Sequence, residues 1–211
     1  IKNELRTYEA DTPYEDQIMF HMYPDVEKIP DFAPRIWYFD AEWQPNEPHQ
    51  GATTMISVDD THAENPVIFA WNEEQDGHSI DFIDREGGYM LYMYENEDDM
   101  HSGFIKHLEE SDPDMLIAHA MMWADLPHLL RRLRNPNRLS PINQVIKPRK
   151  NVGYRDTQQP ILGRLCFDTA LPWNSGSGLE SVWQKSGKGQ FRSRKLASIA
   201  EELKLTEEYG E

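Results

Sequence analysis

Residues 35–43, with the sequence Arg-Ile-Trp-Tyr-Phe-Asp-Ala-Glu-Trp, constrain the fold more than any other segment. Their aromatic and β-branched side chains predict a strand. Alternate side chains of a strand share one face, so Asp40 and Glu42 are expected to point the same way. Neighbouring carboxylates repel each other, and partial burial adds to the cost of ionising them. Mg²⁺ or Mn²⁺, which prefer carboxylate and water oxygens, would relieve both effects. The alternative is a strand end whose acids simply reach solvent.

The segments around this strand predict an α/β domain with a mixed sheet. The opening run of strands argues against a doubly wound nucleotide-binding fold, and no Gly-rich phosphate loop is present. Residues 141–168 predict extended strands or a hairpin around Gly153 and Gly163. The further strands are predicted at 52–58, 66–71, 89–94 and 115–119, and the helices at 100–111, 125–133, 171–184 (broken by Gly176 and Gly178) and 196–203.

Length and composition predict one globular domain. The chain has 211 residues, which suits one sizeable core better than two. No apolar run approaches a membrane span, so no membrane partner is expected. The only cysteine, Cys166, excludes a disulfide within the chain and fits an intracellular setting. Because the first residue is Ile1, we expect an interior piece of a longer chain, with a lead-in at 1–34 and the domain at 35–211.

Charge is distributed unevenly along the chain. The net charge of −16 argues at first against a nucleic-acid partner. However, residues 1–114 hold 28 acidic and 6 basic side chains, and the basic residues gather later. Two interpretations stay open: a face for phosphates, or a solvated surface with uneven charge. The basic residues of 131–164 are Arg131, Arg132, Arg134, Arg138, Lys147, Arg149, Lys150, Arg155 and Arg164.

Asp125 strengthens the case for a metal site. It follows the predicted buried strand 115–119 and begins a predicted helix, where the helix dipole favours a carboxylate. A plain N-cap aspartate would look the same. As a third carboxylate after a strand and loop, Asp125 could complete a metal site with Asp40 and Glu42.

Several segments of the sequence resemble motifs of the 3′→5′ proofreading exonuclease domain of family B DNA polymerases. Tyr38-Phe-Asp-Ala-Glu-Trp43 resembles its first exonuclease motif, and residues 112–130 resemble the second, a buried strand followed by Asp-Leu-Pro and a helix. Residues 139–141, 163–168 and 195–203 resemble segments that follow in the same order, and Tyr8–Asp11 resembles the exit from the preceding domain. The likeness is colinear over nearly the whole chain.

The resemblance implies an RNase H-like mixed sheet flanked by helices, with an inserted β-hairpin, and two-metal phosphodiester hydrolysis. Asp40 would bridge two Mg²⁺ or Mn²⁺ ions, Glu42 would hold the ion that activates water, and Asp125 would hold the second. The implied partners are the 3′ end of single-stranded DNA, or a primer-template, and the polymerase domain of the same parent chain. We expect the DNA contacts at Lys147, Arg149, Lys150, Arg155 and Trp123.

The sequence departs from the family pattern at three places. Ala120 stands where the second motif has Asn, and Ala124 stands where it has Phe. The third motif, Tyr-x-x-x-Asp, is not found after Asp125 and is expected beyond Glu211, so the fragment by itself is expected to be a weak nuclease. Two alternatives stay open: a catalytically inactive structural or DNA-guiding domain, which Ala120 favours, and a stand-alone nuclease of the same four-carboxylate superfamily.

Other reactive side chains are expected to be structural. In the resembled family the position of Asp168 is structural, so a role as fourth ligand is the weaker interpretation. Cys166 lies in an apolar strand and is expected to be inert. His119 is expected to belong to the core strand, and Trp43, like Trp123, is either a core residue or a platform for a base.

Overall fold

The structure is a computed structural model that describes residues 33–44, 51–74, 76–83, 88–147, 159–173, 178–188, 193 and 195–205. Internal contacts divide the chain into two units, Ile1–Ala33 and Pro34–Glu211. All described residues except Ala33 belong to the second unit. The predicted lead-in at 1–34 lies outside the described residues except for its last two positions.

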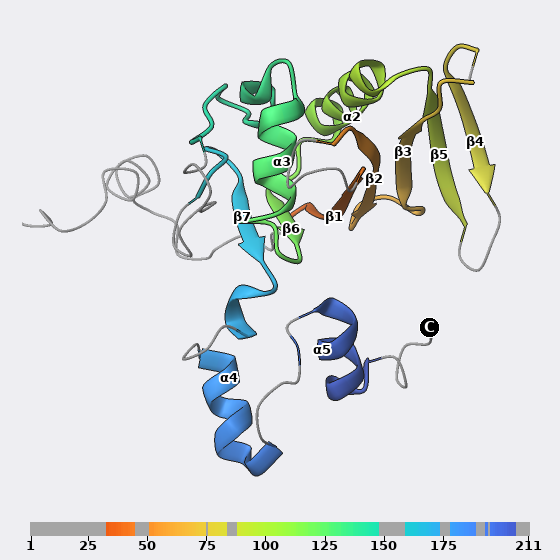
Figure 1. The fold of residues 1–211 in the computed structure, drawn as a ribbon. Helices are drawn as coiled ribbons and strands as arrows, with labels where there is room; N and C mark the ends of the chain where they lie inside the picture. The colour runs from red at the N-terminus through yellow and green to blue at the C-terminus, as the bar shows by residue number, and fades with distance from the viewer. Residues whose placement is uncertain are drawn as a thin grey trace, which may run out of the picture. The chain divides into compact units, whose positions relative to one another are not determined.

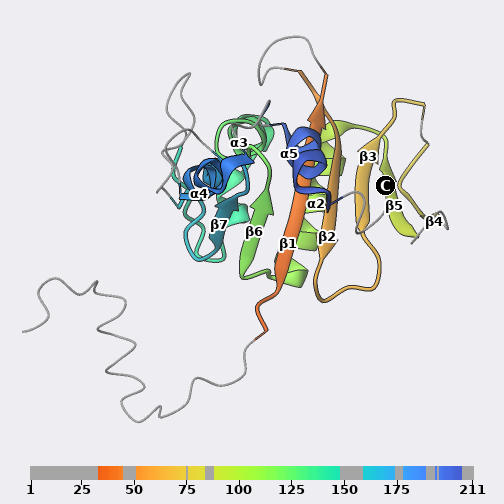
Figure 2. The same cartoon turned by 90° about the horizontal axis from the view of Figure 1, so that it is seen from below.

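A seven-stranded mixed sheet organises the domain, with strand order β4-β5-β3-β2-β1-β6-β7 (Figures 1 and 2). β1 pairs antiparallel with β2 on one side and parallel with β6 on the other. β2 pairs antiparallel with β3, whereas β5 is parallel to β3, and β7 is parallel to β6. The strands are β1 (Ile36–Trp43), β2 (Thr53–Asp60), β3 (Val67–Trp71), β4 (Ser79–Ile83), β5 (Tyr89–Tyr94), β6 (Met115–Ala118) and β7 (Leu165–Asp168).

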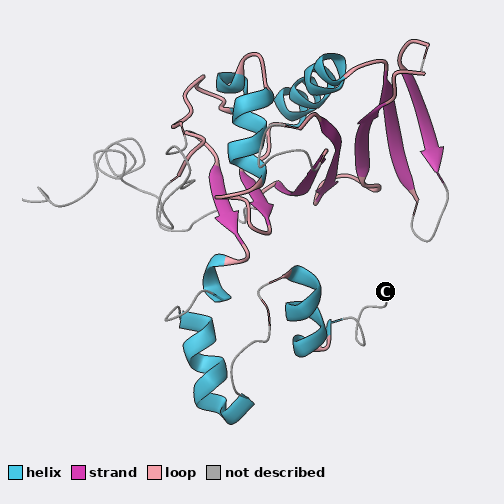
Figure 3. Ribbon diagram, viewed as in Figure 1, coloured by secondary structure: helices cyan, strands magenta, loops and turns pink. Residues whose placement is uncertain are grey.

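One helix follows β5 and a second follows β6. Further helical segments lie on either side of β7 in the chain (Figure 3). The side chain of Asn96 caps α2 by accepting a hydrogen bond from the Asp99 N–H at 3.0 Å. Asp112 ends this helix in the left-handed conformation, with φ of 44°. The helical segments are α2 (Glu97–Ser111), α3 (Asp125–Arg132), η1 (Pro136–Leu139), η2 (Leu171–Trp173), α4 (Gly178–Trp183), η3 (Gln184–Lys188, kinked at Gly187) and α5 (Leu196–Leu203).

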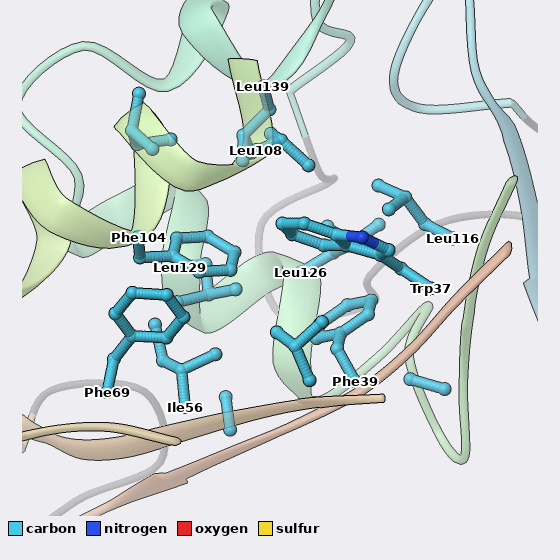
Figure 4. Close-up of a cluster of buried hydrophobic side chains, with 14 of the residues drawn as sticks. Trp37, Phe39, Ile56, Phe69, Phe104, Leu108, Leu116, Leu126, Leu129 and Leu139 are labelled. Atoms are coloured by element: carbon cyan, nitrogen blue, oxygen red, sulfur yellow. The ribbon is translucent and has the colours of Figure 1, made fainter. Parts of the chain in front are cut away.

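The hydrophobic core fills the space between the sheet and helices α2 and α3 (Figure 4). Trp37 and Phe39 alternate with exposed residues along β1, so one face of the central strand is apolar. They share the core with Leu108 from α2 and Leu126 from α3. Burying a side chain such as Leu108 stabilises the fold by roughly 1.5–3 kcal/mol. The helices therefore cover one face of β1, while Asp40 and Glu42 belong to the other face.

A buried ion pair fixes the start of β1 on β2. Arg35 donates to the carboxylate of Asp60 through Nε and Nη2, and the Trp37 indole N–H adds a hydrogen bond of 2.9 Å. Burial by itself would raise the pKa of Asp60, but the hydrogen bonds from Arg35, the His62 amide and Trp37 hold it below its ordinary value. A one-residue slip of β1 would break the hydrogen bonds that Arg35 and Trp37 donate to Asp60.

The structure confirms the predicted mixed α/β architecture with a sheet flanked by helices. The predicted helix at 196–203 is α5. β4 was not predicted, because the strand is short and most of its five residues are exposed. Residues 165–168 form a strand of the main sheet parallel to β6, which agrees with the extended-strand alternative predicted for 141–168 and not with the hairpin alternative. Of the hairpin, the described residues show one antiparallel bridge, Val145 to Ile161.

The predicted helix at 171–184 is replaced by separate segments, η2 and α4. Gly178 is the first residue of α4, which agrees with the expected break at the glycines. No helix within the described residues is long and apolar enough to cross a membrane.

Candidate functional site

The candidate site lies where β1 extends past its neighbour β6. The two strands pair only from Ile36 to Tyr38 of β1, because β6 ends at Ala118. Beyond Tyr38, Asp40 and Glu42 are exposed, whereas Ala41 between them is buried. The predicted sharing of one face by the two carboxylates is confirmed by this alternation. On this side of β1 the backbone needs partners other than β6.

Asp125 supplies one of these partners. It is the first residue of α3 and is only 3% exposed. Its carboxylate accepts hydrogen bonds from the Ala41 N–H and from its own amide. The second oxygen, Oδ2, is buried and has no hydrogen-bond partner among the described residues. A buried carboxylate with one unsatisfied oxygen is costly, so the position is one where a cation would be stabilised.

The environment of Asp125 favours its protonated form. Burial raises the pKa of Asp125 to about 7, and the nearby charges of Asp40 and, to a smaller extent, Asp168 act in the same direction. The backbone hydrogen bonds oppose this rise only in part. Asp125 and Asp40 therefore lie close enough for their charges to interact, as the sequence predicted for a shared site.

Asp168 has a structural role in the loop that precedes Asp125. Its Oδ1 accepts hydrogen bonds from the amides of Ala120 and Ala170, both at 2.9 Å, and its Oδ2 accepts from the Met122 amide at 2.8 Å. The side chain is 1% exposed. The carboxylate thus holds the loop between β6 and α3 in place, in agreement with the structural role expected from the sequence.

Ala120, the position where the resembled motif has Asn, adopts a left-handed backbone conformation with φ of 63°. Its carbonyl accepts hydrogen bonds from the amides of Trp123 and Ala124, so the strained residue forms the turn into α3. An L-residue with a Cβ atom pays about 1–2 kcal/mol for this conformation, which Gly and Asn adopt more readily.

The donor set fits a hard divalent cation, because the carboxylate oxygens of Asp40, Glu42 and Asp125 are the ligands that Mg²⁺ and Mn²⁺ prefer. The unsatisfied Oδ2 of Asp125 supports this fit. Over the part of the chain that the structure describes, no three His, Cys, Asp or Glu side chains are close enough to form a metal-binding group. The convergence of Asp40, Glu42 and Asp125 on one ion therefore stays a prediction.

Much of the charge that is segregated in the sequence is paired in the fold. Acidic residues of α2 and its C-cap lie against four of the arginines in 131–164, which at these positions favours a solvated surface with uneven charge over a face for phosphates. Arg164 is 6% exposed and also donates to the carbonyls of Leu139 and Pro113, so it is structural. The four ion pairs are Arg132–Glu97, Arg134–Asp98, Arg138–Glu109 and Arg164–Asp112.

The predicted DNA contacts are described only in part. Arg149, Lys150 and Arg155 lie outside the described residues, whereas Lys147 is exposed. Trp123 is 40% exposed, on the turn that leads to Asp125, and its indole is accessible to a ligand. Trp43 stacks on His128 with ring centroids 4.4 Å apart, which gives it a role in packing.

Cys166 behaves as expected from the sequence, whereas His119 does not belong to the core strand, because β6 ends at Ala118 and His119 follows it in a half-buried position. Burial raises the pKa of the Cys166 thiol to about 11, so the thiol is not activated as a nucleophile. His119 is within hydrogen-bonding distance of the Thr169 hydroxyl, with 3.0 Å between Nδ1 and Oγ1. This contact ties the end of β6 to the residue after β7.

A buried polar cluster beside the site was not predicted from the sequence. Thr53 of β2, His101 of α2 and His128 of α3 are at most 4% exposed, and the Thr53 hydroxyl lies between the two imidazoles. No local pattern distinguishes these residues from ordinary strand and helix positions, because the cluster forms only through tertiary contacts. The one available signal is the occurrence of two histidines on the apolar faces of predicted helices.

Comparison with known proteins gives no family assignment: no protein-family model matches the sequence, and no curated protein matches it.

Proposed function

We propose that this chain is a 3′→5′ exonuclease domain of the family B DNA polymerase type, with an RNase H-like fold. The observation that carries the proposal is Asp125, a buried carboxylate with one unsatisfied oxygen, a pKa raised to about 7 and a charge interaction with Asp40. Such an arrangement weakens the fold, and titratable groups kept in unfavourable surroundings are concentrated at functional sites. The mixed sheet, with Asp40 and Glu42 on its central strand, supports the same assignment.

The proposed chemistry is hydrolysis of the 3′-terminal phosphodiester of single-stranded DNA. Two divalent ions, when bound, would activate a water molecule and stabilise the departing 3′ oxygen. Asp40 and Glu42 would hold ions from the exposed face of β1, and Asp125 would hold one from the start of α3. The hydrogen bond from the Ala41 amide orients the Asp125 carboxylate, and the exposed indole of Trp123 would stack on an unpaired base.

A second candidate function is a DNA-guiding domain of the same type that has lost catalysis. Ala120 favours it, because the side chain at this position cannot donate or accept a hydrogen bond, unlike the Asn of the resembled motif. The two functions differ in what they require of Asp40 and Asp125: the guiding domain needs neither metal binding nor hydrolysis.

Binding of Mn²⁺, followed by electron paramagnetic resonance, tests the proposal most directly. We expect the wild-type chain to bind Mn²⁺ and Asp40→Asn and Asp125→Asn each to weaken binding by about tenfold or more, as expected for loss of a charged ligand. Asp81→Asn, on the edge strand β4, is the matched control and should bind as the wild type does. Equal Mn²⁺ binding by all four proteins would refute the metal site.

A degradation assay then separates the two functions. The substrate is single-stranded DNA labelled at its 5′ end, incubated with Mg²⁺ and the complete natural protein that carries this sequence. The exonuclease predicts a ladder that shortens from the 3′ end and disappears in Asp40→Asn. Metal binding without degradation would favour the DNA-guiding domain.

A further inference from the structure

The hydroxyl of Thr53 joins three elements that meet beside the candidate site. Its Oγ1 lies 3.0 Å from Nε2 of His101 in α2 and 3.0 Å from Nε2 of His128 in α3. Thr53 is the first residue of β2 and is completely buried. A single side-chain oxygen on the sheet therefore contacts both helices that cover it.

The chemistry of this cluster gives its hydrogen bonds a direction. A hydroxyl has one proton, so it can donate to one imidazole and must accept from the other. The carboxylate of Glu97 lies 3.8 Å from Nε2 of His101, which favours a proton on that nitrogen. His101 therefore donates to Thr53, and Thr53 donates to His128. In this arrangement Nε2 of His128 is the acceptor.

The backbone of Thr53 is fixed as firmly as its hydroxyl. Its amide donates to Glu97 at 2.8 Å, and its carbonyl accepts from the indole of Trp71 at 2.5 Å. Glu97 is in turn held by Arg132 of α3, through hydrogen bonds from Nε and Nη2. Burial would raise the pKa of Glu97, but the bonds from Arg132 and Thr53 hold it below its ordinary value, so the carboxylate is charged.

The same cluster reaches the strand that carries Asp40 and Glu42. Thr53 is opposite Trp43 in the β1–β2 register, at an irregularity between Glu42 and Trp43. The ring of Trp43 stacks on His128, with 17° between the planes. His128 follows Asp125 by three residues, which places the two side chains on neighbouring positions of one helix face. Two hydrogen bonds therefore hold the first turn of α3 against the sheet: one joins Asp125 to the Ala41 amide of β1, and the other joins His128 to Thr53 of β2.

We infer that Thr53 is a positioning residue: its hydroxyl, held between His101 and His128, fixes the first turn of α3 and thereby sets the position of Asp125 beside Ala41. Without this bond, the first turn of α3 would be held against the sheet by the Asp125–Ala41 hydrogen bond, the stacking of Trp43 on His128 and apolar contacts. The consequence for metal binding rests on the proposed function, but the effect on the Asp125–Ala41 contact does not.

Amide hydrogen exchange followed by NMR tests the inference at the contact itself. In Thr53→Val, which keeps the shape and removes the hydroxyl, the Ala41 amide should exchange about tenfold faster relative to the Phe69 amide of the interior strand β3. Thr53→Ser should restore the wild-type ratio within about twofold, because it keeps the hydroxyl. Thr54→Val, at the next residue of β2, leaves the hydroxyl of Thr53 in place and is the matched control.

A second variant keeps the test decisive if Thr53→Val does not fold. His128→Phe keeps a ring against Trp43 but loses the acceptor, so the Ala41 amide should again exchange about tenfold faster. In the double variant the effects should not add, since both changes remove the same bond. An unchanged ratio of Ala41 to Phe69 exchange in either single variant overturns the inference.

Mn²⁺ titration of the same variants separates this inference from the proposed function. If Thr53 positions Asp125 in a metal site, Thr53→Val should weaken Mn²⁺ binding by about tenfold and Thr53→Ser should not. If the wild-type chain binds no Mn²⁺, the metal site fails, and the exchange of the Ala41 amide still decides the role of Thr53.

Discussion

Asp125→Asn should change the pH dependence of stability in a way that can be worked out from the structure. The pKa of Asp125 is raised from 3.8 to about 7. At pH 4 the carboxyl group of Asp125 is protonated in the folded protein, so its burial costs little free energy of unfolding. As the pH rises to 7 the unfolded chain ionises first, so the folded state is progressively disfavoured relative to it. A shift of about three units corresponds to about 4 kcal/mol at pH 8.

The asparagine variant avoids this loss but carries its own cost. Its amide oxygen can still accept from the Ala41 N–H, while its amide nitrogen replaces the unsatisfied Oδ2 and leaves a buried donor that costs about 1–2 kcal/mol at every pH. The variant should therefore be slightly less stable than the wild type at pH 4 and about 2–3 kcal/mol more stable at pH 8. The change between the two pH values, about 4 kcal/mol, is independent of the amide cost.

Urea unfolding of both proteins at pH 4, 6 and 8, without divalent ions, measures this difference. Contributions of other titrating groups cancel between variant and wild type. Asp168→Asn is a comparison variant: it disturbs the backbone hydrogen bonds that the Asp168 carboxylate accepts and should destabilise by about 2–3 kcal/mol. A difference between Asp125→Asn and wild type that stays constant from pH 4 to pH 8 would show that Asp125 is an ordinary ionised carboxylate.

Three further predictions concern stability and are read from thermal or urea unfolding. Ala120→Gly should stabilise by about 0.5–1 kcal/mol because the residue has a positive φ, whereas Ala197→Gly in α5 should destabilise by about as much. Gly103→Ala should destabilise by about 1–2 kcal/mol although alanine favours helices, since the added Cβ would lie 2.0 Å from Oη of the buried Tyr94. Arg134→Ala should change stability by less than about 1 kcal/mol, since its ion pair is largely exposed; a larger loss would contradict this view of the surface charges.

Sequence patterns predicted the elements whose side chains carry a clear periodicity. The alternation in residues 36–43 and the helical spacing in residues 196–203 correspond to β1 and α5. They failed for β4, whose middle three residues are all exposed and show no alternation. The parallel pairing of β7 with β6 also escaped prediction, because register between distant strands depends on tertiary packing rather than on local propensity.

The positions of the three carboxylates in the candidate site could be predicted from the sequence, but the side chains that surround them could not. Asp40 and Glu42 are placed by strand alternation, and Asp125 by the helix start that follows a buried strand. Whether an arginine such as Arg132 faces phosphate or an acid depends on which helix it meets, and the sequence does not contain that information in local form. The same holds for Thr53, whose neighbours come from two helices.

The parallel pairing of β1 with β6 has a consequence for the order in which the domain is made on the ribosome. Ile36 pairs with Met115, which is 79 residues later in the chain. At about 5–20 residues per second, roughly 4–16 s separate the synthesis of the two strands. During this interval β2 can cover one edge of β1, while the other edge, in a segment rich in aromatic residues, has no strand partner. In the nascent chain, residues 36–43 are therefore an unpaired hydrophobic strand of the kind that chaperones bind.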